Sequence, residues 1–261
     1  MRRLIILIGL VVVFVALLAL SRSAASWKHA IASGEPGALL YAASFDGGGL
    51  DGFNGDWGQY SGRLAAQLDA GRMQISVGDP GAGAYAIAEP HFGDFDLRVE
   101  ARAVAGPVDN GYGVVFRLQN KDNNQVDDDN YYLFLISSDG YYRVSRAFDG
   151  SERIISDWIA SPLVNQGMDA VNHLRVVAQG DQFRFSINDQ PVQLCIPESP
   201  DGESTFDALG NCMGAMVDTL TDATIPSGQI GVSALSTPTG GEGVVAAFDN
   251  VLVYAPETNE G

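Results

Sequence analysis

The ten residues FDLRVEARAV, numbered 95–104, decide the fold class of this chain. Phe95, Leu97 and Val99 alternate with charged residues, and the alternation continues through Ala101 and Ala103. In a strand, residues two apart point to the same face, so this segment has one apolar and one charged face. We therefore expect a strand of an antiparallel sheet with one face in a core and the other in water.

Similar segments recur along most of the chain. Short apolar runs are separated by clusters of glycine, proline, asparagine and aspartate, and no long amphipathic helix interrupts them. Asp139-Gly140 should turn one hairpin and Asn188-Asp189 a second. The sequence therefore predicts an all-β fold, a two-sheet antiparallel β-sandwich. Besides 95–104, the expected strands are 39–45, 72–77, 84–88, 111–118, 131–137, 141–148, 153–159, 174–179, 183–187, 229–234 and 244–254.

The sandwich is expected to form one domain. Glycine (31 residues) and proline (11 residues) are spread along the chain as turn residues, and an apolar content of 46% is enough for one sizeable core. We place the domain at residues 39–255, after a polar spacer at 27–38. The tail at 256–261 is expected to be disordered.

The N-terminus has the pattern of an export segment. The residues from Leu4 to Leu20 carry no charge and follow Arg2 and Arg3. This run is longer than the apolar part of most cleaved signal peptides and slightly short of a full membrane span. Residues 1–26 are therefore expected to be a retained single-pass anchor helix, which we favour, or a signal peptide cleaved near residues 23–25. Both alternatives place the domain outside the cytoplasmic membrane.

The exposed part of the chain is strongly acidic. The chain has 15 basic and 32 acidic residues, and all the acidic residues follow position 34. Setting aside Arg2, Arg3 and Arg22 of the export segment leaves 12 basic residues against 32 acidic ones, a net charge of −20. Such a domain repels phosphate backbones and anionic lipid surfaces. We expect no nucleic-acid partner, and contact with a membrane through the N-terminal segment only.

Two cysteines, Cys195 and Cys212, lie 17 positions apart in a segment without strand pattern. In an oxidising exterior, their even number and close spacing favour a disulfide over two unpaired buried thiols. The spacing fits neither a CxxC redox site nor a zinc cluster. We expect the disulfide to staple an inserted loop near 195–227.

Eight short phrases occur along the chain in a familiar order. They are FD at 45–46, FDL at 95–97, GVVFR at 113–117, NYYLF at 130–134, DGYYRV at 139–144, NHLRV at 172–176, GQIG at 228–231 and FDNV at 248–251. Together they resemble the laminin G-like (LamG-like) and 3-keto-disaccharide-hydrolase-like branch of the concanavalin A-like lectin/glucanase superfamily. The resemblance implies a jelly-roll sandwich over residues 39–254. It does not choose among lectins, polysaccharide-binding modules, adhesion domains and glycan hydrolases.

Asp96 and Glu100 are the candidates for catalysis if the chain is an enzyme. They share a strand face, with Asp94 just before them, and glycoside hydrolysis needs a pair of carboxylates. Arg98 and Arg102 interleave with these acids, so a charge-paired sheet face explains the same pattern. The glucanases that the chain resembles use the pattern Glu-x-Asp-x-x-Glu, which is missing here.

Arg117, Tyr132, Tyr142 and Arg143 are the candidates for ligand binding. We expect them on neighbouring strands of one sheet, where arginine donors and tyrosine rings suit hydrogen bonding and stacking against sugars. One member of each tandem tyrosine pair, at 131–132 and 141–142, must point away from the core. Whether a loop or a sheet edge covers that outward ring stays open.

Other chemistry has weaker signals. The run DNNQVDDDN at 122–130 is rich in oxygen donors and could bind calcium, but Val126 breaks the calcium-loop template, so we favour a solvated hairpin loop. The histidines, His29, His91 and His173, have no partner motif for catalysis. We therefore expect a non-catalytic glycan-binding or surface-interaction module. The alternatives are a glycoside hydrolase acting on 3-keto-disaccharides or β-glucans, and a structural envelope domain.

Overall fold

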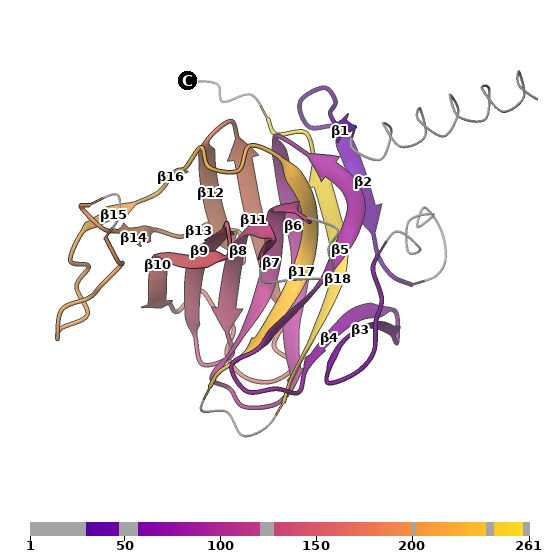
Figure 1. Cartoon of the computed structure of the whole chain (residues 1–261), viewed down its shortest axis with the longest axis horizontal. Coiled ribbons are helices and arrows are strands. Elements are labelled where there is room, and N and C mark those ends of the chain that lie inside the picture. Colours follow the sequence, from indigo (N-terminus) through magenta and orange to yellow (C-terminus); the bar gives the residue numbers. More distant parts are fainter. Residues whose placement is uncertain (1–29, 47–56, 121–127, 200–201, 239–242, 258–261) are drawn as a thin grey trace, which may run out of the picture.

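The chain folds as two β-sheets packed face to face, with a small two-stranded ribbon at one side (Figure 1). This computed structural model describes residues 30–46, 57–120, 128–199, 202–238 and 243–257, and the secondary structure of these ranges is strand, turn and loop without an α-helix. The predicted all-β sandwich is confirmed for them. No helix in the described ranges has the length and apolar character to cross a membrane. The expected N-terminal helix lies outside them.

Sheet A has seven strands, and neighbouring strands run antiparallel except at one edge, where β1 runs parallel to β5. Its order is β1 (Ile31–Ala32), β5 (Gly83–Phe92), β17 (Gly228–Ser236), β7 (Asn110–Gln119), β8 (Asn130–Ser137), β9 (Tyr141–Phe148) and β10 (Ser151–Ala160).

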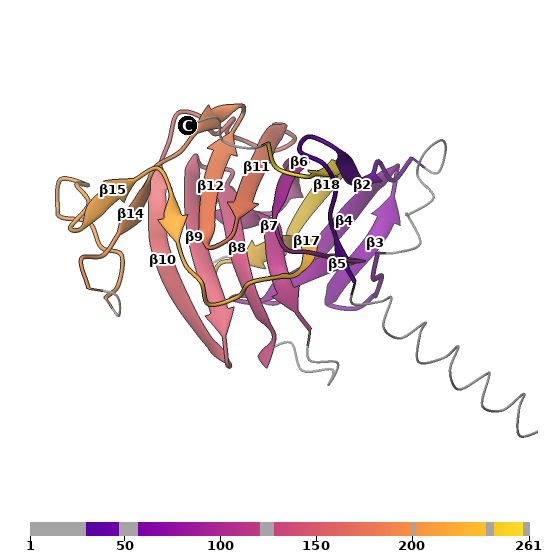
Figure 2. The same ribbon diagram turned by 90° about the horizontal axis from the view of Figure 1, so that it is seen from above.

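Sheet B has nine strands and covers the other side of the core (Figure 2). Its main path is β13 (Gln190–Pro191), β12 (Gln182–Ile187), β11 (Asn172–Gln179), β6 (Phe95–Ala105), β18 (Val244–Tyr254), β4 (Arg72–Val77) and β3 (Leu64–Asp69). Two further strands join it, since β2 (Leu39–Ala43) pairs with β18 and β16 (Leu220–Thr221) pairs with β12.

Aromatic side chains from both sheets fill the middle of the sandwich. Phe116 of sheet A stacks on Tyr132 with ring centroids 5.3 Å apart, and both rings pack against Phe183 of sheet B. The decisive strand β6 behaves as its alternation predicts, because Phe95, Leu97, Val99, Ala101 and Ala103 are all buried in this core. Each fully buried phenylalanine contributes about 1.5–3 kcal/mol relative to an exposed one. Burial of the apolar strand faces therefore stabilises the packing of the two sheets.

Both predicted hairpins are confirmed. Asp139-Gly140 joins β8 to β9, and Gly140 has φ of 98°, a conformation that favours glycine. Asn188 and Asp189 both have positive φ, at 50° and 64°, and turn the chain from β12 to β13. Asparagine and aspartate tolerate this region better than most residues.

Several short elements differ from the sequence prediction. The described part of the expected spacer is docked on the domain, because β1 pairs with β5 and the N–H of Gly37 donates to the carbonyl of Ala255 at 2.9 Å. In the inserted segment, β14 (Leu194–Ile196) pairs with β15 (Ala215–Val217). Two- and three-residue strands are too short for a visible alternation. The longer β3 was not predicted, because its alanines and glutamine are weak strand formers.

Candidate functional site

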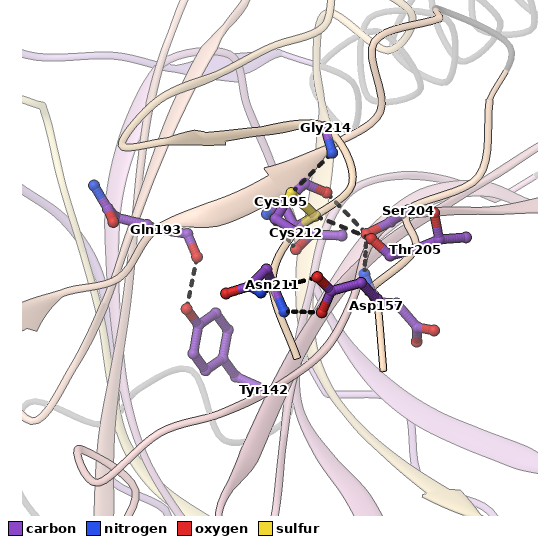
Figure 3. The surroundings of a disulfide bond; sticks show 11 residues. Tyr142, Asp157, Gln193, Cys195, Ser204, Thr205, Asn211, Cys212 and Gly214 are labelled. Carbon is purple, nitrogen blue, oxygen red and sulfur yellow. Dashed lines mark hydrogen bonds between the residues drawn. A yellow bond between two sulfur atoms is a disulfide. The ribbon is translucent and has the colours of Figure 1, made fainter. Parts of the chain in front are cut away.

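The tandem tyrosines divide between the core and the outer face of sheet A. Tyr132 and Tyr142, the two predicted to bind a ligand, are the inward members, because Phe134 and Val144 set the phase of the buried face of β8 and β9. Tyr142 donates its hydroxyl to the carbonyl of Gln193 at 2.6 Å (Figure 3). The expected site is therefore corrected here: the rings that reach the outer face are Tyr131 and Tyr141.

Arg117 is also buried, contrary to the expectation that it faces a ligand. A register shift between Phe116 and Gln119 and a positive φ of 50° at Arg117 mark a bulge in β7. A bulge re-aims a side chain, and here it turns the guanidinium inward. That group donates to the carbonyls of Ile225 and Gly180 at 2.9 and 2.7 Å, and lies over the ring of Phe183. Arg117 therefore links loops and core instead of lining a site.

Arg143 is the one member of the predicted set of four that lies on the outer face of sheet A. It forms an ion pair with Glu152 of β10, and its guanidinium carbon lies 5.7 Å from the ring centroid of Trp158. Ligand binding by Arg143 stays a prediction. Glu152 and Trp158 gave no sequence signal for this contact, because β10 follows an irregular register with β9.

An open cleft of about 530 Å³ lies on this outer face. Side chains from β5, β17, β8, β9 and β10 line it, and they include Tyr85, Tyr131, Leu133, Leu235 and Glu152. Tyr85 and Tyr131 meet edge to face with ring centroids 6.0 Å apart. The cleft thus combines two tyrosine rings and an apolar floor with one carboxylate, in the size range of ligand sites.

Glycines leave the middle of the outer face of sheet A without side chains. Gly113 of β7 and Gly231 of β17 lie between residues that point into the core, so each occupies an outward position. A Cβ at Gly113 would come within 2.1 Å of the carbonyl oxygen of Phe134, and one at Gly231 within 2.2 Å of that of Ala86. These positions therefore exclude a side chain.

Hydrogen bonds fix Tyr85 at one end of the cleft. Its hydroxyl donates to the buried carboxylate of Asp129, and its carbonyl accepts from the hydroxyl of Tyr60 at 2.9 Å. Burial, followed by the hydrogen bond with Asp129, raises the pKa of Tyr85 well above its usual value. The phenol is thus neutral near pH 7 and presents a pre-oriented ring.

The carboxylates proposed for catalysis lie on the outer face of sheet B, on the other side of the molecule from the cleft. Both oxygens of Asp96 accept from Arg98 and Arg175. Burial alone would raise the pKa of Asp96, but these hydrogen bonds outweigh it and lower the pKa. The expected charge pairing of this face is present. A general acid needs the opposite shift.

Glu100 does not share a pocket with Asp96. It lines a small depression of about 240 Å³ with His173, Asp189 and Asn250, and its Oε1 accepts from the Asn250 amide at 3.0 Å. Asp96 instead lines a separate groove. The structure therefore does not bring the two acids together over one ligand, and their catalytic role stays a prediction.

The acidic run predicted as a possible calcium loop is described only in part, since residues 121–127 lie outside the described ranges. Within those ranges, no group of three or more histidine, cysteine, aspartate or glutamate side chains is placed to hold a metal ion. Asp46 and Asp249 come from the two ends of the domain sequence, and burial first, then the charges of Asp46 and Glu100, raise the pKa of Asp249. Calcium binding stays a prediction.

The predicted disulfide between Cys195 and Cys212 is confirmed (Figure 3). It holds the insertion against β10, because the N–H of Cys195 donates to Ser156 Oγ at 3.0 Å and Asp157 N–H donates to Ser204 Oγ at 3.0 Å. The Ser204 hydroxyl in turn donates to the Cys195 carbonyl at 2.8 Å. The insertion therefore flanks the edge of sheet A beside the strand that carries Glu152.

Solved structures with the same sandwich are distant in sequence. A protein of unknown function with a galectin-like fold from Bacillus subtilis is 14% identical and has a TM-score of 0.55, with 85% of this chain and 97% of that chain covered. A Bacillus licheniformis β-glucanase is 10% identical with a TM-score of 0.52, covering 85% of this chain and all (100%) of that one. The carbohydrate-binding module CBM66 from Bacillus subtilis is 17% identical with a TM-score of 0.50, covering 75% and 93%.

These relatives confirm the predicted concanavalin A-like fold. At such identities they show the fold alone. No curated protein matches the chain. A family model does match, that of the 3-keto-alpha-glucoside-1,2-lyase-like domain, and it spans residues 41–251, from the first long strand to the last. On this match, the chain belongs to the family of 3-keto-alpha-glucoside-1,2-lyase-like domains.

Proposed function

We propose that the protein is a non-catalytic glycan-binding module that holds a sugar chain in the cleft of sheet A. The observation that carries this proposal is the pair of tyrosine rings, Tyr85 and Tyr131, at an open cleft of about 530 Å³. Sugar rings have apolar faces that stack on aromatic rings, and hydroxyl groups that donate to carboxylates such as Glu152. The likeness to a structure named as a carbohydrate-binding module supports the same reading.

The proposal includes a place outside the cytoplasmic membrane, with the N-terminal segment as an anchor. Two features support it: the uncharged run from Leu4 to Leu20 after two arginines, and the Cys195–Cys212 disulfide. Disulfides persist in oxidising compartments and are rare in the cytosol.

A binding panel tests the function. The purified protein is titrated with neutral and charged oligosaccharides by calorimetry, with and without calcium. We expect saturable binding, and Tyr131→Ala should weaken it by about two- to tenfold because a stacked ring contributes about 0.5–1.5 kcal/mol. Tyr141→Ala is the matched control, since Tyr141 is exposed on the same sheet but does not line the cleft. Equal loss in both variants, or no binding at all, would count against the cleft.

An enzyme is the second candidate, and the family match favours it. Incubation with 3-keto-disaccharides and β-glucans, followed by mass spectrometry of the products, separates the two functions. Turnover that persists in Asp96→Asn and Glu100→Gln but is lost in Glu152→Gln would assign a reaction to the cleft. Turnover lost in the Asp96 and Glu100 variants would place the reaction on sheet B. Binding without product supports the module.

A further inference from the structure

The ion pair at the cleft presents its two charges unequally. The Arg143 side chain is only 13% exposed, whereas the Glu152 side chain is 53% exposed. Trp158 lies against the guanidinium of Arg143, while Glu152 lines the cleft itself. A ligand that enters the cleft therefore meets the carboxylate before the guanidinium.

Apart from Arg143, the described lining of the cleft adds no positive charge beside Glu152. Among the described residues that line it, Glu152 is the one with an ionised side chain. The strand β17 on its other side belongs to the stretch 185–261, which contains no lysine, arginine or histidine. Behind Tyr85 lies a second carboxylate, that of Asp129. The local field therefore has the same sign as the net charge of the whole acidic domain.

We infer that the cleft selects uncharged glycans against anionic ones, and that Glu152 is the residue that determines this specificity. The inference rests on the proposed function, because it concerns the ligand of the same cleft. A hydroxyl of a neutral sugar can donate to the Glu152 carboxylate, whereas a uronate or sulfate group at the same place would meet a like charge. At low ionic strength this repulsion is only weakly screened.

Matched pairs of glycans, each with a neutral and an anionic member of the same backbone, test the inference. The probes are laminarin and its C6-oxidised form, cellohexaose and its C6-oxidised form, and homogalacturonan with and without full methyl esterification. Calorimetry at about 20 mM and 500 mM salt gives both dissociation constants for each pair. We expect the neutral member to bind at least tenfold tighter at low salt, a difference of about 1.4 kcal/mol, and the ratio to shrink at high salt.

Two variants should move the ratio in opposite directions. Glu152→Gln keeps the size of the side chain and one acceptor oxygen for Arg143, and should reduce the preference for the neutral member to below threefold. Arg143→Met removes the buried positive charge and should increase the preference. Glu89→Gln, an exposed glutamate on β5 that does not line the cleft, should leave the ratio unchanged. Thermal unfolding of each variant verifies that it is folded.

The outcomes separate this inference from the function on which it rests. If no member of any pair binds, the proposed function fails and the inference fails with it. Should neutral and acidic members bind equally, or the acidic member bind tighter, the glycan-binding function stands and the inference is wrong. A neutral preference that Glu152→Gln leaves intact would also overturn the assignment to Glu152.

Discussion

Arg117 is a buried charged residue whose hydrogen bonds stabilise the interior of the sandwich. Its guanidinium donates to three backbone carbonyls, those of Ile225, Gly93 and Gly180, and Ile225 among them is fully buried and needs such a donor. Burial lowers the pKa of Arg117, although nearby acids oppose that shift, and an arginine stays charged even so. The residue is a structural cross-link between β7 and the loops beside sheet B.

Replacing Arg117 by methionine should therefore be severe. Three carbonyls lose a charged donor, and a hydrogen bond to a charged group contributes about 1.5–3 kcal/mol. We expect Arg117→Met to lower the free energy of unfolding by at least about 3 kcal/mol, as measured by urea denaturation. Arg63→Ala removes an exposed arginine from its pair with Asp79 and should cost less than about 1 kcal/mol. Similar losses in both variants would contradict the cross-link.

Asp96 should give the protein part of its acid sensitivity. Because its folded-state pKa lies below the unfolded value of about 3.9, its ion pairs stabilise the fold fully above that value, and the stabilisation disappears as the pH falls through the folded-state pKa. Asp96→Asn should therefore cost about 2 kcal/mol at pH 7. The difference from the parent protein should shrink below about pH 4, as measured by urea denaturation across this range.

Asp249 provides the control of opposite sign. Its folded-state pKa is raised, chiefly by burial, so the ionised form is disfavoured in the fold and its contribution to stability falls as the pH rises. Asp249→Asn should leave stability at pH 7 unchanged or higher. A loss at pH 7 as large as that of Asp96→Asn would show that the hydrogen bonds of these residues matter more than their charges.

Residue patterns predict faces well when a strand is regular, and fail where it is not. The alternation in β6 correctly assigns its core residues and its charged face. The same rule fails at Arg117, because a bulge adds one residue and exchanges the two faces. It also could not tell Tyr131 from Tyr132, since a tandem pair satisfies either phase.

At the scale of elements, hairpins can be predicted from the sequence because their signal is local. Asp139-Gly140 and Asn188-Asp189 mark turns by backbone conformation alone. The strands of the insertion cannot be predicted in this way. The strands β14 and β15 are each three residues long. The disulfide and the hydrogen bonds of Ser156 and Ser204 hold their ribbon in position.

Removing the disulfide should loosen this element and lower overall stability. Closing a loop of this size contributes about 3 kcal/mol in the chain-entropy model, which corresponds to about 6–12 °C in melting temperature for a domain of this size. Reductant should lower the melting temperature of the parent protein accordingly. The Cys195→Ser/Cys212→Ser double variant should melt at the reduced value and ignore reductant, because the chain has no other cysteine. An unchanged melting temperature would contradict this account.

At the scale of the whole molecule, the sequence predicts the architecture but not the site. Whether a segment forms a strand can be predicted from its local alternation. Which strands become neighbours in a sheet depends on contacts between residues far apart in the sequence. The cleft needs β17, near the end of the chain, to lie between β5 and β7. Its lining runs from Gly81 to Leu235, so no sequence window contains the group. Only the tandem tyrosines gave a local signal of an outward ring.

The position of β18 has a consequence for how the protein is made. This strand is the last one in the described residues, yet it lies inside sheet B and pairs with β6, β4 and β2. During synthesis those strands are made early, and the edges that pair with β18 stay unpaired until it has been made. At about 5–20 residues per second, the wait between β6 and β18 lasts several seconds to tens of seconds. The two halves of sheet B, on either side of β18, therefore cannot be joined until this strand has been made.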